Sequence, residues 1–118
     1  MMLDWNGYQQ QLLAAIGELG QNSPDTVRGY RQLSAAGNTQ NVLGAKTREL
    51  IALAVAVTRQ CDGCIAIHTD AALKQGATRE EIVEALGVAI TVNAGAALVY
   101  SARVLDAYGA KVPSAATY

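Results

Sequence analysis

The segment CDGCIAIH, residues 61–68, contains both cysteines and the only histidine of the chain. Two cysteines separated by two residues can form a disulfide across one helical turn, and the partial positive charge of a helix N-terminus favours a thiolate there. In a helix that begins at Cys61, with about 100° per residue, Cys61, Cys64 and His68 fall within an arc of roughly 60°. The spacing therefore predicts three reactive groups on one stripe of a single helix.

The position of the histidine bears on which sulfur reacts first. His68 follows Cys64 by four residues, so its ring can lie near that sulfur and accept its proton. This favours Cys64 as the nucleophile and Cys61 as the resolving thiol. Cys61 is closer to the helix end, however, and can be the more exposed of the two. The residues alone leave the order of the two cysteines open.

Glu49, twelve residues before Cys61, is the nearest carboxylate placed to orient the histidine. Its helix has few positions suited to solvent, so we expect Glu49 either at a helix end in water or partly buried beside a partner. Burial would raise the pKa of this carboxyl towards the range in which it relays protons with His68. The alternative is a first-turn glutamate after Thr47 that only stabilises the helix dipole.

The same residues permit other functions. Small cysteines and a lone histidine are often plain core residues, which would make the chain a non-enzymatic helical assembly protein. A structural zinc site needs about four ligands, so Glu49 or a neighbouring subunit would have to complete the set. Haem attachment requires a histidine directly after the second cysteine, where Ile65 stands, and a thioredoxin-like site requires a βαβ pattern that is absent.

Composition indicates an all-α protein. Of 118 residues, 51% are apolar and 16% charged, there is no phenylalanine, and much of the apolar content is alanine, the best helix former. So little charge predicts that another subunit covers part of the apolar surface, as in a homo-oligomer. The net charge of −1 and the lack of a basic tract argue against a nucleic-acid partner.

No export or membrane segment is expected. The N-terminal twenty residues lack a basic region and contain Asp4 and Glu18, unlike a signal peptide. The uncharged segment Ala85–Ser101 is shorter than the ~20 residues that span a bilayer and contains Thr91 and Asn93, so it predicts a buried helix. These features favour a cytoplasmic location, where a cysteine pair is kept reducible.

Capping signals predict a single bundle of five or six helices and no strands. Asp4 and Ser23 are placed as N-caps, and Thr78 with Glu81 forms a capping box. The expected helices are Trp5–Leu19, a segment from Pro24 to a stop at Gly37, a helix buried on every side over Leu50–Val57, a helix from Cys61 closed by Gly76, a helix from Arg79 to a weak point at Asn93–Gly95, and Ala96–Tyr108. A polar loop, residues 38–41, and a loose or neighbour-packed tail, residues 110–118, complete the chain.

The run from Glu49 to Leu86 resembles the alkylhydroperoxidase D-like branch of the carboxymuconolactone decarboxylase family. A glutamate is followed after eleven residues by C-x-x-C, then after three residues by a histidine, and then by the segment GATREEIVE. The resemblance implies an all-helical domain over residues 1–118, with its core in residues 42–108, that assembles into trimers or hexamers.

The resemblance also implies thiol peroxidase or disulfide reductase chemistry without an organic cofactor or a metal. In this chemistry Cys64 attacks a small hydroperoxide or a disulfide, Cys61 resolves, and His68 with Glu49 moves the proton. A lipoyl-bearing protein or a peroxiredoxin would be the redox partner. Gly63 stands where well-known members have a further histidine, so part of their proton relay is missing. Lactone decarboxylation, with His68 as general base, is the alternative and belongs to members that lack C-x-x-C.

Overall fold

The structure, a computed structural model, describes residues 1–113, and these residues form helices without any strand. The helices are α1 (Trp5–Asn22), α2 (Pro24–Ala35), α3 (Gly37–Gln40), α4 (Ala45–Thr58), α5 (Asp62–Lys74) and α6 (Arg79–Lys111). The all-α expectation is confirmed. The last five residues of the predicted tail lie outside the described part.

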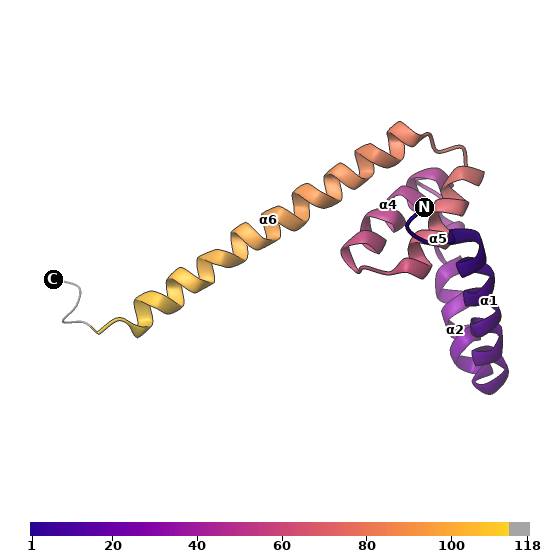
Figure 1. Cartoon of the computed structure of the whole chain (residues 1–118), viewed down its shortest axis with the longest axis horizontal. Helices are drawn as coiled ribbons and strands as arrows, with labels where there is room; N and C mark the ends of the chain where they lie inside the picture. The colour runs from indigo at the N-terminus through magenta and orange to yellow at the C-terminus, as the bar shows by residue number, and fades with distance from the viewer. Residues whose placement is uncertain (114–118) are drawn as a thin grey trace.

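Two helical pairs and one long helix make up the architecture (Figure 1). α1 and α2 form an antiparallel hairpin, and the start of α1 packs on α5. α4 and α5 lie side by side, and the first part of α6 returns against α4. The rest of α6 extends away from the other helices, so the chain measures 65 × 39 × 36 Å along its principal axes.

The helix ends follow the capping signals in the sequence. The Asp4 carboxylate accepts a hydrogen bond of 3.2 Å from the Gly7 amide at the start of α1. At the start of α6, the Glu81 amide donates to the Thr78 hydroxyl and the Thr78 amide donates to the Glu81 carboxylate. Gly76 follows α5 with φ +82°, the left-handed conformation that glycine adopts without penalty. Local signals thus set where α5 ends and α6 begins.

Several predicted boundaries are wrong. The predicted break at Asn93–Gly95 is absent, because the Asn93 amide donates to the Ala89 carbonyl at 2.7 Å and to the Thr58 hydroxyl of α4 at 2.8 Å. Both bonds satisfy this polar side chain without ending the helix. α6 also continues past Gly109 to Lys111, and α1 continues past Gly20 to Asn22. Most of the predicted polar loop before α4 is the short helix α3.

The buried core is small and is built from short side chains. Leu53 of α4 packs with Ala72 of α5 and Ala77, and Leu50 and Ile82 border this cluster. Alanine allows the three helices to approach closely, which explains how so few large residues hold them together. The expectation that residues 50–57 are buried on every side is wrong, since Ile51 and Val55 remain about half exposed (48% and 54%).

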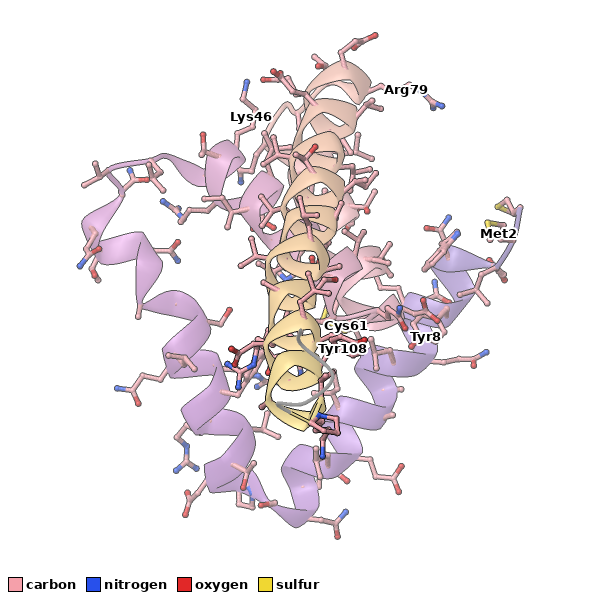
Figure 2. The ribbon with its side chains drawn as sticks, turned by 90° about the vertical axis from the view of Figure 1, so that its left-hand side faces the viewer. Met2, Tyr8, Lys46, Cys61, Arg79 and Tyr108 are labelled. Atoms are coloured by element: carbon pink, nitrogen blue, oxygen red, sulfur yellow. A yellow bond between two sulfur atoms is a disulfide. The ribbon has the colours of Figure 1, made fainter. Side chains whose placement is uncertain are left out.

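The predicted buried helix over residues 85–101 is also wrong for the isolated chain. Ala89 is the one buried residue of α6. The outer half of the helix extends without a neighbouring helix in Figure 1, and side chains stand out around it in Figure 2. By length and composition alone, α6 could cross a membrane. The helix is therefore a large apolar surface that the chain itself leaves uncovered.

Candidate functional site

The candidate site lies where α4 and α5 meet at the C-x-x-C turn. After α4, Gln60 adopts a left-handed conformation (φ +53°) and reverses the chain. The Cys61 amide then donates to the Ala56 carbonyl at 3.1 Å, which ties the turn to the last part of α4. Cys61 is the N-cap of α5, so the helix begins one residue after the start at Cys61 that the sequence predicts.

The two sulfurs of this turn are joined in a disulfide, Cys61–Cys64. Their Cα atoms lie 5.2 Å apart, a separation that one helical turn provides. The Cys64 amide donates a hydrogen bond of 3.2 Å to the Cys61 sulfur. Cys61 therefore lies where the unpaired amides of a helix N-terminus stabilise negative charge. When the disulfide opens, one of the two sulfurs leaves as a thiolate. This position stabilises that thiolate most if the leaving sulfur is that of Cys61.

His68 and Glu49 form the second part of the site. Glu49 lies in the second turn of α4, and its Oε2 is 2.7 Å from Nδ1 of His68 on α5. Both side chains are partly buried, with 32% of the histidine and 24% of the glutamate exposed. An ionised carboxylate only accepts hydrogen bonds, so Nδ1 carries the hydrogen and donates it. The other ring nitrogen, Nε2, is left free to accept or donate a proton.

All four residues singled out in the sequence thus come together at the α4–α5 interface. Cys64 and His68 are one turn apart on α5, and Glu49 approaches from α4. Of the two placements expected for Glu49, the structure has the partly buried one beside a partner. The catalytic roles of these residues stay predictions, since the geometry gives their positions and not their reactivity.

Sequence reasoning missed the close cover that α1 provides over the C-x-x-C turn. A Cβ atom placed on Gly63 would lie 2.6 Å from Cδ2 of Leu12, well inside van der Waals contact. The sequence could not identify Leu12 as the contacting residue, because it is far from Gly63 in the chain. A glycine between two cysteines is the one hint that another segment approaches there.

The part of the chain that the structure describes offers no cluster of three or more histidine, cysteine, aspartate or glutamate side chains placed to hold a metal ion. Both cysteine sulfurs are engaged in the disulfide in this state. The zinc alternative would require reduced thiols and a ligand from elsewhere.

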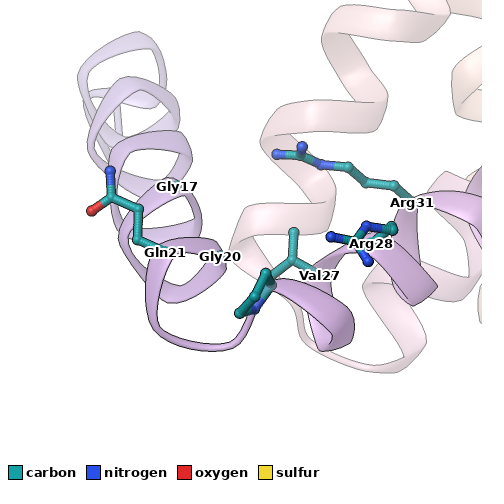
Figure 3. A pocket seen from close by; sticks show the side chains of 7 residues that line it. Gly17, Gly20, Gln21, Val27, Arg28 and Arg31 are labelled. Atoms are coloured by element: carbon teal, nitrogen blue, oxygen red, sulfur yellow. The ribbon is translucent and has the colours of Figure 1, made fainter.

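A cavity of about 300 Å³ lies between α1 and α2, away from the candidate site (Figure 3). Arg28 and Arg31 line it together with Gly17, Gly20 and Val27. Arg28 already pairs with Asp25 at 2.7 Å, and the cavity contains neither a nucleophile nor a carboxylate. The reactive groups of residues 1–113 are therefore at the disulfide and not in this cavity.

Comparison with known proteins places these features in one family. The model of the carboxymuconolactone decarboxylase family matches residues 24–107. Among solved structures, the chain is similar to the apo form of a carboxymuconolactone decarboxylase family protein from Legionella pneumophila. The TM-score is 0.72 and the identity 34%, over 89% of this chain and 94% of the other.

Two relatives by sequence carry no assigned activity. The chain is 48% identical over 108 residues to an uncharacterized protein of Haemophilus influenzae, covering 92% of this chain and 96% of that protein. It is 37% identical to "Uncharacterized protein 4 in cox locus" of Paracoccus denitrificans, covering 78% of this chain and 83% of that protein. The names of these relatives assign no chemistry to the site.

Proposed function

The chain belongs to the carboxymuconolactone decarboxylase family, and from this premise we propose that it is a thiol-dependent oxidoreductase of the alkylhydroperoxidase D-like type. The observation that carries the proposal is a closed Cys61–Cys64 disulfide one turn from a histidine that a carboxylate orients. Cys64 is the attacking sulfur, Cys61 resolves, and His68 with Glu49 moves the proton. The substrate is a small hydroperoxide or a disulfide.

The two sulfurs have different surroundings, and this supports their order. The Cys64 amide and the N-terminus of α5 both stabilise a thiolate at Cys61. Cys64 has His68 one turn further along the same stripe, so its proton has an acceptor in Nε2. A stabilised thiolate is the better leaving group, so Cys61 leaves when the disulfide opens, and Cys64, whose proton His68 accepts, is the sulfur that attacks.

Peroxide reduction by this site balances as follows. The Cys64 thiolate attacks the outer oxygen of the hydroperoxide, the O–O bond breaks, and the alcohol leaves with a proton from His68. Cys64 is now a sulfenic acid. The Cys61 thiolate attacks its sulfur, water is released as the hydroxyl group takes up a proton, and the Cys61–Cys64 bond forms. Two thiols and one hydroperoxide thus yield one disulfide, one alcohol and one water.

An external dithiol closes the cycle. Its thiolate attacks Cys64, the electron pair of the broken S–S bond moves to Cys61, and a mixed disulfide forms. The second thiol of the donor then attacks the donor sulfur that is bonded to Cys64. A disulfide forms within the donor, and Cys64 is released as a thiolate. Two electrons pass from the donor to the protein, so a lipoyl-bearing protein fits as reductant. Run in the opposite direction, the same steps reduce the disulfide of a partner such as a peroxiredoxin.

We also propose that the active form is a cytoplasmic homo-oligomer, either a trimer or a hexamer. The accessible surface is 9320 Å², against about 6,100 Å² for a compact monomer of this mass. The radius of gyration is 20.5 Å, against roughly 13.5 Å for a compact domain of this length. The excess has the size of an obligate subunit interface, and 10 of the 21 exposed large apolar residues in the described part of the chain lie on α6, more than on any other helix.

A second copy suits this surface better than a bilayer. The first half of α6 packs on α4, where Ala89 is buried and Asn93 bonds to Thr58, so lipid cannot surround that half. The uncharged run also contains Thr91 and Ser101, whose hydroxyls bond back to carbonyls of their own helix. A neighbouring subunit can pack small apolar side chains against such a helix.

A rapid-mixing experiment on the reduced protein tests the chemistry. Cumene hydroperoxide is added without oxygen, and the products are quenched, alkylated and weighed by mass spectrometry. We expect the wild type to lose two thiols per peroxide, and C61S to stop at a sulfenic acid on Cys64 that dimedone traps. C64S, of nearly equal volume, should keep Cys61 reduced. Peroxide consumption that is unchanged in C64S would overturn the assignment.

The family's decarboxylase chemistry is the second candidate, and the His68–Glu49 pair is the observation that favours it. A partly exposed histidine held by a carboxylate is a competent general base without any sulfur. A lyase of this kind would keep its activity in the double variant C61S/C64S and lose it in H68Q. The oxidoreductase would lose its activity in both.

A further inference from the structure

Leu12 of α1 lies directly over the peptide that links the two cysteines. Its Cδ2 is 2.6 Å from the position of a Cβ on Gly63, and its Cδ1 and Cγ are 3.8 Å from the same point. Only glycine at residue 63 leaves the leucine this place. The cover over the C-x-x-C turn is therefore a specific contact, in which Leu12 occupies the space that a side chain at residue 63 would need.

The contact lies on one flank of Cys64, which is the cysteine within α5. At about 100° per residue, Gly63 lies about 100° from Cys64 on one side, while His68 lies roughly 40° away on the other. Leu12 therefore covers the flank of Cys64 that faces away from His68. The histidine and Glu49 border the opposite flank.

Other side chains of α1 border the same part of α5. Gln9, one turn before Leu12, and Asp70 of α5 line a common cavity between the two helices. Asp70 pairs with Lys74 at 3.0 Å. Tyr8 and Trp5 continue the same side of α1, with their rings edge to face at 6.5 Å. Leu12, Gln9, Tyr8 and Trp5 are partly buried, whereas the Asp70 side chain is 44% exposed. The redox helix therefore has a polar flank from α4 and an apolar flank from α1.

We propose that Leu12 determines the specificity of this site by forming the apolar wall against which the organic group bonded to Cys64 rests. The proposal depends on the function proposed above and narrows the thiols that react with Cys64 to those with uncharged, apolar organic groups. A charged group beside Leu12 would lose its hydration without gaining a partner, which disfavours it.

The wall acts during the mixed-disulfide step. A thiolate RS⁻ attacks Cys64, the S–S bond breaks, Cys61 leaves as a thiolate, and R becomes attached beside Leu12. A second RS⁻ then attacks the sulfur of R, RSSR leaves, and Cys64 is freed with its electron pair. Contact between R and Leu12 exists in the mixed disulfide and in the transition state that leads to it, so it changes the rate.

The test compares two monothiols of similar acidity, benzyl mercaptan and the anionic 2-mercaptoethanesulfonate. Each reduces the disulfide of the purified full-length protein, and alkylation at timed intervals gives the two rates. We expect the wild type to prefer benzyl mercaptan. L12A and the nearly isosteric L12Q should each lower that preference by about tenfold, the effect of losing part of an apolar contact. L12M should retain it, and L13A, which changes an exposed leucine of the same helix, should leave it unchanged.

A second variant tests the contact itself. The new Cβ in G63A forces Leu12 to swing aside, so G63A should lower the preference as L12A does, and the double variant should show no further loss. Equal slowing with both thiols in L12A and L12Q, or additive effects in the double variant, would mean a purely structural role and overturn the proposal.

The two proposals fail separately. If the wild type discriminates between the thiols but does not react with peroxide, the peroxidase chemistry is wrong and the proposed role of Leu12 is retained. If peroxide turnover is normal but the thiol preference is absent in the wild type or unchanged in both Leu12 variants, Leu12 does not set specificity.

Discussion

Nδ1 of His68 lies 2.7 Å from Oε2 of Glu49, although nineteen residues separate them in the chain. The carboxylate fixes the ring, assigns the hydrogen to Nδ1, and stabilises the imidazolium that forms when Nε2 takes a proton. Both residues are partly buried, so water screens this pair less than it would at the surface.

The first prediction concerns this pair. E49Q keeps the size of the side chain and removes its charge, so an imidazolium at His68 loses its partner and the ring can settle in either tautomer. We expect disulfide formation by reduced protein with cumene hydroperoxide to slow by about tenfold to a hundredfold. The control is E84Q, an exposed glutamate of α6. Identical rates in E49Q and wild type would show that the carboxylate does not serve the reaction.

The second prediction concerns the ion pair between Lys46 of α4 and Glu81 of α6, at 2.8 Å. The hydrogen bond from Lys46, followed by the one from the Thr78 amide, holds the pKa of Glu81 below its usual range. A folded-state pKa below the unfolded one gives stability that is present at neutral pH and lost as the pH falls through the folded value.

E81Q should therefore unfold at a lower urea concentration than wild type at pH 7, and the difference should shrink towards pH 3. The glutamine still completes the capping box, so the change isolates the charge. Urea unfolding followed by circular dichroism gives the midpoints. E80Q, at the exposed neighbouring position, serves as control, and a difference for E81Q that is constant across this range would refute the linkage.

The third prediction concerns the outer half of α6, where Leu98 and Leu105 are about three-quarters exposed in the isolated chain. If a second copy covers them, L98E/L105E places two charges in an interface, and the assembly should dissociate into monomers. Light scattering after size-exclusion chromatography measures the mass. L13E, which charges an exposed leucine of α1, should leave the mass unchanged.

A wild type that is monomeric in detergent-free buffer would contradict the homo-oligomer. A wild type that stays in solution only with detergent would point to a membrane as the occupant of α6 instead.

The fourth prediction concerns Ala72, which is completely buried against Leu53 (0% exposed). A72L forces three extra carbons into the contact between α4 and α5, and we expect a loss of about 1–3 kcal/mol in unfolding free energy. The matched change at an exposed position of α1, A14L, should cost far less. Thermal unfolding at several protein concentrations separates this loss from an effect on assembly. Stability equal to wild type in A72L would mean that the helices can separate there without cost.

Local sequence determined the helices and the composition of the site. Caps at Asp4 and Thr78 and the left-handed Gly76 are decided by residues within a few positions of each other, so they could be read without a structure. The same holds for Cys61, Cys64 and His68, because helical periodicity alone puts them on one stripe.

Only the tertiary structure decided which flank of that stripe is polar and which apolar. The contact of Glu49 with His68 depends on how α4 packs against α5, and that of Leu12 with Gly63 on how α1 crosses α5. The continuity of α6 through Asn93 likewise depends on a hydrogen bond to Thr58, 35 residues away. The free energy of such contacts comes from segments distant in the chain, so neither capping nor periodicity carries information about them.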